Sequence, residues 1–225
     1  MNRRFSKIEW QDLAAAFAFL GNSLLKPMSQ GEPVGLNSVF WQNFPDFESH
    51  EVALAVNQCS DYVCRSITDS DKANFYDSSI SVAIRSVSAE FTRLFVGPPK
   101  PLAAPWETLH LASGASVGFG QPTFDMQDLL RCHNLEIHNK NNQYADHIGI
   151  ELLFLSVLCR DVADVVDTKD FAAAEMKVQE YVATHPARWV ASLADAVAHA
   201  EPEGYFICLL NLTTALLNLF HMSDQ

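Results

Sequence analysis

Paired cysteines and the common catalytic motifs are both missing from this sequence. None of the five cysteines belongs to a CxxC pair, and the odd number leaves one thiol over: Cys59, Cys64, Cys132, Cys159 and Cys208. A zinc or iron–sulfur site needs clustered thiolates, so we interpret these residues as the reduced thiols of a cytoplasmic protein. The chain also lacks GxSxG, GxxxxGK[ST], GxGxxG and HExxH motifs. No motif therefore indicates an active site.

Positive charge is scarce. Lysine and arginine number 15 against 27 aspartates and glutamates, which gives a formal net charge of −12. We expect no nucleic-acid partner, because such a chain is repelled by the phosphate backbone, whereas a basic peptide or protein is attracted. Only 19% of the residues are charged and 48% are hydrophobic. This is enough apolar surface to offset the conformational entropy that folding costs, so an ordered protein is expected.

Neither end of the chain has the composition of a signal peptide or a membrane span. Residues 2–5 (NRRF) superficially look like a twin-arginine start, but Glu9 and Asp12 precede an apolar run that covers only residues 13–20. A signal core tolerates neither these acidic residues before it nor the polar Asn22 and Ser23 that follow immediately. The apolar stretch at 203–221 is interrupted by asparagines and threonines and has no basic anchors. We therefore expect a soluble protein that is not integral to a membrane.

Apolar residues recur at helical spacing through most of the chain, and strand-like alternation is almost absent. Ser6 and Glu9 form a capping box that opens a helix ending before Pro27. A well-patterned helix follows at about 80–96, and Gly97-Pro98-Pro99 stops it. The other expected helices cover about 49–67, 123–133, 144–160, 168–183, 186–198 and 203–221. The sequence predicts an all-α fold, a helical bundle of roughly eight to ten helices.

Prolines and glycines gather in the middle of the chain. They are frequent between residues 97 and 122, which predicts a long ordered loop or hinge there. We expect a single all-helical domain over 1–225, with an N-terminal helical part at about 1–97 and a C-terminal helical part at about 123–225.

Metal-ligand residue types gather in the second half of the chain: His133, Glu136, His138, Asp146 and His147. Their spacing is poor for a site, because adjacent residues such as Asp146 and His147 diverge by about 100° on a helix. Asp146 also suits the start of the buried helix, where the helix dipole favours a negative charge. A metal-dependent hydrolase that uses this cluster is kept as an alternative function, and a general helical adaptor as another.

Three motifs resemble those of a known family. Residues 91–98 (FTRLFVGP) and 104–107 (APWE) resemble the aromatic-x-x-L-F-x-G-P and P-P-W-E motifs of the TorD/DmsD family of redox-enzyme maturation chaperones. Residues 143–147 (QYADH) occupy the place of that family's E-P-x-D-H motif, with Gln143 and Tyr144 standing where the family has Glu-Pro. Helix order and length extend the resemblance from about Trp10 to Phe220.

The resemblance implies a cytoplasmic chaperone and not an enzyme. Its expected partner is the twin-arginine leader of a molybdopterin oxidoreductase of the DMSO reductase type, held until cofactor insertion and folding are complete. The mature client and the export machinery are further expected partners. No cofactor is expected in the chaperone itself, and it would be a monomer or a helix-swapped dimer.

The resemblance also assigns roles to nine residues of a leader-binding site. Apolar groove contacts are expected from Phe91, Leu94, Phe95 and Trp106. The prolines expected to shape the loop are Pro98 and Pro105. Glu107 and Asp146 are expected to face the leader's arginines, while His147 orients the carboxylate or binds peptide backbone. Structural roles stay open beside these: core packing for Leu94 and Phe95, a plug in the hinge for Trp106 and a solvated loop charge for Glu107.

Overall fold

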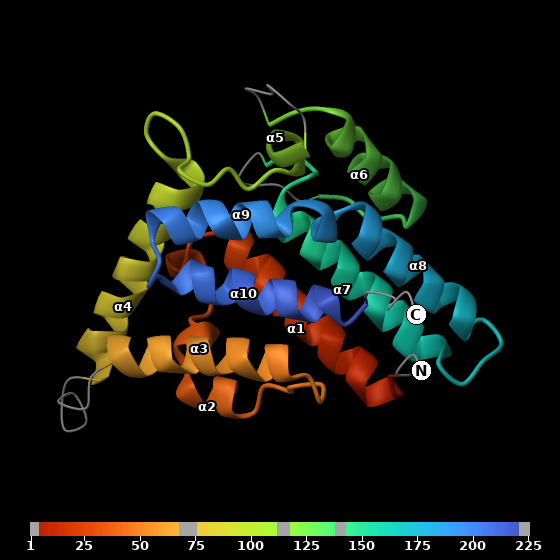
Figure 1. Ribbon diagram of the computed structural model, residues 1–225, viewed down its shortest axis with the longest axis horizontal. Coiled ribbons are helices and arrows are strands. Elements are labelled where there is room, and N and C mark those ends of the chain that lie inside the picture. The colour runs from red at the N-terminus through yellow and green to blue at the C-terminus, as the bar shows by residue number, and fades with distance from the viewer. Residues whose placement is uncertain (1–4, 68–75, 112–117, 138–142, 221–225) are drawn as a thin grey trace. The chain divides into compact units, whose positions relative to one another are not determined.

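The computed structural model describes residues 5–67, 76–111, 118–137 and 143–220. Within these ranges all regular secondary structure is helical, and the one β-type contact is an isolated bridge (Figure 1). The predicted all-α class is confirmed. The α-helices of the described residues are α1 Lys7–Leu25, α2 Ser38–Gln42, α3 His50–Ser66, α4 Tyr76–Phe91, α5 Glu107–Leu111, α6 Gln121–Cys132, α7 Ile148–Val165, α8 Phe171–Thr184, α9 Pro186–Ala200 and α10 Tyr205–Asn218.

Local capping signals place several helix ends as predicted. The backbone N–H of Ser6 donates to Glu9 Oε2 at 2.8 Å, and the N–H of Glu9 donates back to Ser6 Oγ at 3.3 Å, which forms the capping box of α1. Ser49 caps α3 with its side chain alone, which accepts from the Val52 N–H. A π-helical turn, Thr92–Val96, continues α4 and ends at Gly97. Gly97 has φ +78°, and a Cβ there would collide with the Lys100 carbonyl.

Other boundaries differ from the sequence prediction. Helix α2, capped by the Asn37 side chain, lies between Pro27 and residue 49, where no helix was expected. Helix α5 lies inside the predicted 97–122 loop. Helix α6 begins two residues earlier than expected, at Gln121; its cap is Gly120, whose N–H donates to Thr123 Oγ1 at 3.3 Å. The chain from 144 to 147 is not yet helical, so α7 begins later than expected.

The chain divides into two compact units, and each draws on distant parts of the sequence. Unit 1 contains the chain up to Leu25, residues 105–192 and the chain from Leu216 onward. Unit 2 contains residues 26–104 and 193–215. Helices α9 and α10 each contribute residues to both units. The prediction of one domain with helical parts on either side of a hinge stays a prediction.

Unit 1 is built around α1 and α7, which pack against each other. Two glycines allow this close approach: a Cβ on Gly149 would lie 2.8 Å from the Gly21 carbonyl oxygen, and a Cβ on Gly21 would lie 2.8 Å from the Gly149 carbonyl oxygen. Phe220 stacks near Trp10 and Phe17 with ring centroids 5.9 and 6.2 Å away. The buried core of α7 provides the base on which the polar residues of this unit are placed.

Unit 2 has a core of aromatic residues from α4, its π-helical continuation and α10. The rings of Phe91 and Phe95 lie 5.7 and 5.1 Å from the ring of Phe206. The buried carboxylate of Glu90 accepts hydrogen bonds from the backbone N–H groups of Tyr205 and Phe206 at 3.1 and 3.0 Å. Glu90 therefore satisfies two backbone donors in the first turn of α10, where N–H groups have no carbonyl partner within the helix. No helix in the described ranges is both long enough and apolar enough to cross a membrane.

Candidate functional site

Two motif segments, about forty residues apart, pair with each other in unit 1. Trp106 and His147 form the isolated antiparallel bridge. Next to it, the backbone N–H of Glu107 donates to the backbone carbonyl of Asp146 at 3.0 Å. The start of α5 is thereby fixed to the start of α7. The two motif segments therefore form one hydrogen-bonded element that joins the starts of these two helices.

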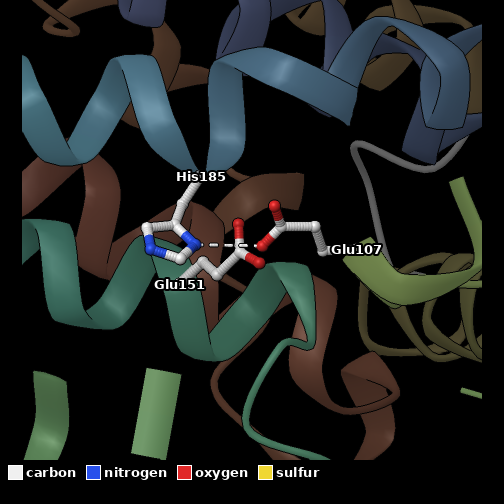
Figure 2. A group of neighbouring side chains, drawn as sticks. All are labelled: Glu107, Glu151 and His185. Carbon is white, nitrogen blue, oxygen red and sulfur yellow. Dashed lines mark hydrogen bonds and ion pairs between the residues drawn. The ribbon is translucent and has the colours of Figure 1, made fainter. Parts of the chain in front are cut away.

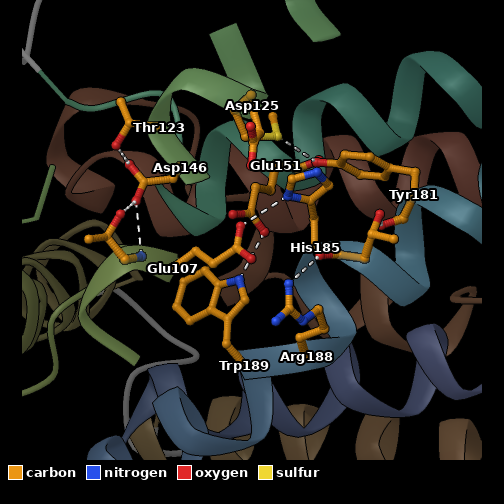
Figure 3. Close-up of polar contacts among 12 residues, drawn as sticks. Glu107, Thr123, Asp125, Asp146, Glu151, Tyr181, His185, Arg188 and Trp189 are labelled. Atoms are coloured by element: carbon orange, nitrogen blue, oxygen red, sulfur yellow. Dashed lines mark hydrogen bonds and ion pairs between the residues drawn. The ribbon is translucent and has the colours of Figure 1, made fainter. Parts of the chain in front are cut away.

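The carboxylate of Asp146 forms the centre of this element and is fully buried. Its Oδ2 accepts from the Thr108 backbone N–H at 3.0 Å and from Thr108 Oγ1 at 2.6 Å. Its Oδ1 accepts from Thr123 Oγ1 at 2.8 Å (Figure 3). Hydrogen bonds to a charged acceptor are the stronger kind. Asp146 thus ties the first turns of α5 and α6 to the entrance of α7.

His147 is buried and caps α7. Its Nδ1 accepts a hydrogen bond from the Gly149 N–H at 3.0 Å, so the proton of the neutral ring lies on Nε2. Burial lowers the pKa of His147 from 6.5 to about 3. The ring is therefore neutral at physiological pH and acts as a helix cap.

A second polar group lies deeper in unit 1 and consists of Glu107, Glu151 and His185, one residue each from α5, α7 and the α8–α9 junction (Figure 2). One ligand-type atom from each lies within 4.8 Å of the other two. His185 Nδ1 is 3.0 Å from Glu107 Oε2. The indole N–H of Trp189 donates to Glu151 Oε2 at 3.1 Å. Both glutamates are at most 1% exposed and His185 is 9% exposed.

Glu151 is the most unusual member of this group. Its second carboxylate oxygen, Oε1, is buried and accepts no hydrogen bond from an N–H or hydroxyl group of the described residues. Burial raises the pKa of Glu151 well above its ordinary value, and the negative charge of Glu107 raises it further. Both causes favour the protonated, uncharged form of the Glu151 carboxyl group, and a positive charge placed beside it would oppose them.

A cleft of about 610 Å³ opens beside this group. Glu107 and His185 contribute to its lining, and α6 supplies the carboxylates of Asp125 and Asp128. Both aspartates are exposed. The apolar part of the wall is formed by Leu111, Pro122 and Leu129. Arg188, which is exposed, also lines the cleft. The cleft therefore combines the α6 carboxylates, one guanidinium and an apolar wall.

Four aromatic residues form a cluster at the surface of the same unit: Trp106, Phe119, Phe124 and Tyr144. The Phe119 ring lies 5.1 Å from that of Phe124 and 5.3 Å from that of Tyr144, and Tyr144 lies 6.2 Å from Trp106. Phe119, Phe124 and Tyr144 are 45%, 47% and 38% exposed. Gly118 lies directly on the Trp106 ring, since a Cβ there would be 3.0 Å from Cδ2. We call these four residues the aromatic cluster.

The nine predicted leader-binding residues are divided between the two units. Unit 1 contains Pro105, Trp106, Glu107, Asp146 and His147; unit 2 contains Phe91, Leu94, Phe95 and Pro98. Only Trp106 and Pro98 reach the surface, because the other seven are buried. The carboxylates of Glu107 and Asp146 already have buried partners, so a leader arginine would have to displace existing contacts. The binding roles of all nine remain predictions.

The predicted metal cluster does not assemble among the described residues. His133 Nδ1 lies 3.0 Å from the Leu129 carbonyl, Glu136 is exposed, and Asp146 and His147 have the separate partners given above. No three of these four place ligand atoms within 4.8 Å of one another. His138 lies outside the described residues. Glu107, Glu151 and His185 are the group that does converge.

Sequence reasoning overlooked Glu151, His185 and the two threonines that bind Asp146. Glu151 did carry a signal, since it is the only charged residue in the apolar run 148–158. A charge on the core-facing side of a buried helix needs a partner. His185 had no such signal, because its partners are distant in sequence.

Comparisons with known proteins define the class of this all-α chain. Residues 70–195, more than half of the chain, match the family model described as nitrate reductase delta subunit. The chain also matches three proteins named "Chaperone protein TorD". That of Vibrio cholerae serotype O1 (El Tor Inaba) is 21% identical over 58% of this chain and 59% of the relative. That of Aliivibrio salmonicida is 25% identical over 59% and 61%, and that of Photobacterium profundum is 23% identical over 59% and 61%.

The alignments thus span about three fifths of the length of these curated relatives. The family match covers the Trp106–Glu107 and Asp146–His147 motifs that pair in unit 1. This chain belongs to the TorD/DmsD family and carries the Asp146–His147 half of its E-P-x-D-H motif.

Proposed function

We propose that this protein is a cytoplasmic chaperone that binds the twin-arginine signal peptide of a molybdopterin oxidoreductase precursor of the DMSO reductase type. Binding would delay export until cofactor insertion and folding are complete. The family supports this role, and so do the relatives named as TorD chaperones. The observation that carries it is that α6 bears both an acidic cleft rim and an exposed aromatic residue, which are the two surfaces that a leader requires.

The arginines of a leader would bind at the cleft rim. Asp125 and Asp128 are exposed and three residues apart, so they lie on the same side of α6. A guanidinium presents a planar fork of donors that matches a carboxylate. Asp128 currently pairs with Arg131, and both side chains are at least 70% exposed. Exposed pairs of this kind contribute little stability, so an incoming arginine can replace Arg131 at small cost.

The apolar region of the leader would bind to the aromatic cluster. Phe124 is adjacent to Asp125 on α6, and its ring contacts Phe119. Exposed aromatic side chains are the preferred anchors of protein interfaces, since they provide contact area at low entropic cost. Tyr144 replaces the family's proline and belongs to this cluster. We therefore assign Tyr144 to the choice of client.

In this proposal two of the nine predicted residues contact the leader and the other seven have supporting roles. Trp106 contacts the leader directly, and exposed Pro98 is kept as a contact residue of unit 2. Pro105, Glu107, Asp146 and His147 position α5, α6 and α7. Phe91, Leu94 and Phe95 hold the core of unit 2. The mature client and the export machinery are further partners under this proposal, and the protein acts as a monomer or a helix-swapped dimer.

Peptide binding tests the function. Synthetic twin-arginine leaders and scrambled peptides of equal composition would be titrated against the whole protein by fluorescence anisotropy. We expect leaders to bind more tightly than their scrambled versions. The double variant Asp125→Asn, Asp128→Asn should bind leaders about fivefold to thirtyfold more weakly, as expected from two exposed ion pairs worth about 0.5–1 kcal/mol each.

The matched control is Asp161→Asn, Asp164→Asn, which removes two exposed aspartates at the same spacing on α7. It should leave leader affinity unchanged. Equal binding of leader and scrambled peptides would identify a general adaptor. No binding of any leader, together with no twin-arginine molybdoenzyme precursor co-purifying from the native cytoplasm, would refute the chaperone function.

A further inference from the structure

The buried group of Glu107, Glu151 and His185 is not required for binding a leader at the α6 rim. The two acids are at most 1% exposed, and the His185 side chain is 11% exposed. Burying one carboxylate is costly, and burying two beside each other adds their mutual repulsion. A fold tolerates such an arrangement when a proton or a cation joins the two acids.

The hydrogen bonds in this group leave one ligand position open. Glu107 Oε2 is paired with His185 Nδ1, and Glu151 Oε2 accepts from the Trp189 indole. Glu151 Oε1 is buried and accepts no hydrogen bond from an N–H or hydroxyl group of the described residues, while the Glu151 carboxyl group lies within hydrogen-bonding reach of Glu107. One ligand-type atom of Glu151 lies within 4.8 Å of one from Glu107 and one from His185. A buried carboxylate oxygen without a donor is rare in native proteins. Its position beside a second carboxylate and an imidazole is suited to a cation.

We propose that Glu107, Glu151 and His185 bind a divalent transition-metal ion of the zinc type. Two carboxylates and one neutral imidazole neutralise a divalent charge, and they are among the ligands that zinc uses in proteins. The cleft gives a route for the ion, because Glu107 and His185 lie in its lining. Three protein ligands leave a further coordination position for a water molecule or a ligand entering from the cleft.

The surroundings of the group favour such an ion over magnesium or calcium. Magnesium and calcium prefer complete sets of oxygen ligands, whereas the nitrogen of His185 suits zinc and its neighbours in the transition series. The Trp189 indole fixes the Glu151 carboxylate from outside the group, as residues surrounding metal ligands commonly do. A bound ion would connect α5, α7 and the α8–α9 junction within unit 1.

Metal titration of the whole protein tests the proposal. Protein freed of metal with EDTA would be titrated with ZnCl₂ by calorimetry, with MgCl₂ as the comparison. We expect one zinc ion per chain, a higher melting temperature with zinc, and no saturable binding of magnesium in the same range. The variant Glu151→Gln should bind zinc at least about a hundredfold more weakly, since losing even a supporting residue of a metal ligand costs 10–100-fold.

Two controls keep this test decisive. Glu151→Gln resembles the protonated acid, so it should retain the circular dichroism spectrum and the leader affinity of the wild type; Glu180→Gln, an exposed change on α8, should bind zinc normally. Cobalt substitution would report the ligands, because Cys132 also lines the cleft. A thiolate-to-cobalt charge-transfer band, less than one equivalent of zinc, or equal zinc affinity in Glu151→Gln and wild type would each overturn the proposal.

Discussion

Removing the Asp146 carboxylate should destabilise the protein strongly, because three donors converge on it. Asp146→Ala deletes two hydrogen bonds from Thr108 and one from Thr123, each to a charged and fully buried acceptor. Bonds to charged groups contribute about 1.5–3 kcal/mol each, and deletion leaves the Thr108 N–H buried without an acceptor. Relief of the carboxylate's desolvation offsets part of this sum. We expect a loss of about 4 kcal/mol in the free energy of unfolding.

Asp146→Asn should cost less, about 1.5 kcal/mol, because the amide oxygen still accepts from Thr108 while the amide nitrogen faces the rotatable Thr123 hydroxyl. Urea unfolding followed by circular dichroism measures both values from the midpoint at constant m. The control is Asp164→Ala on the exposed face of α7, which should stay within about 0.5 kcal/mol of wild type.

A double-mutant cycle with Thr108→Val separates the hydrogen bond from general damage. The two changes should be less than additive by about 1–2 kcal/mol, because the Thr108 hydroxyl bond is counted in both single variants. A loss below 1 kcal/mol in Asp146→Ala, or full additivity in the cycle, would refute the assignment of Asp146 as the tie between α5, α6 and α7.

Three further outcomes follow from the buried groups of unit 1. The pKa of His147 falls from 6.5 to about 3, so between these pH values the unfolded state binds a proton that the folded state does not. The free energy of unfolding should therefore drop by about 1.4 kcal/mol per pH unit on acidification below pH 6.5. His147→Asn, which can still cap α7, should show a weaker dependence of unfolding free energy on pH, and an unchanged dependence would contradict this. The pKa of Glu151 is raised, so above its ordinary pKa of 4.5 the metal-free folded state keeps a proton that the unfolded state releases, and the free energy of unfolding should decline as pH rises. In urea unfolding, the stability of Glu151→Gln relative to wild type should therefore increase between pH 5 and 8. A decrease in this relative stability would count against a protonated Glu151. Gly149→Ala places a Cβ 2.8 Å from the Gly21 carbonyl oxygen and should cost about 1–3 kcal/mol in unfolding free energy, whereas Gly31→Ala, which meets only the end of a lysine side chain, should be nearly neutral.

Helix starts and ends were predictable where the signal is local. The capping box of α1 and the cap of α3 depend on side chains within three residues of the helix start, and Gly97 ends its helix through its own backbone conformation. Helix α5 was not predictable, because its five residues are too few for a periodic pattern. Its first turn is held by Asp146, which lies 38 residues further along the chain.

The candidate site was predictable only in part. Family motifs located the Trp106–Glu107 and Asp146–His147 segments, and the structure pairs them. Their degree of burial was not visible in the motifs. Residue type alone favours an exposed aspartate, whereas Asp146 is fully buried because two threonines supply the donors that water would otherwise provide.

The helical class and the acidic character of this protein can be read from its amino-acid sequence. Both follow from composition and from patterns that repeat within one or two helical turns. Which acids face water and which are buried depends instead on how the helices pack. Asp125 and Asp128 line an open cleft, whereas Glu107 and Glu151 meet inside unit 1 with His185. The reason is physical: a carboxylate's charge and function depend on the groups that surround it, and here those groups arrive from helices far apart in the chain.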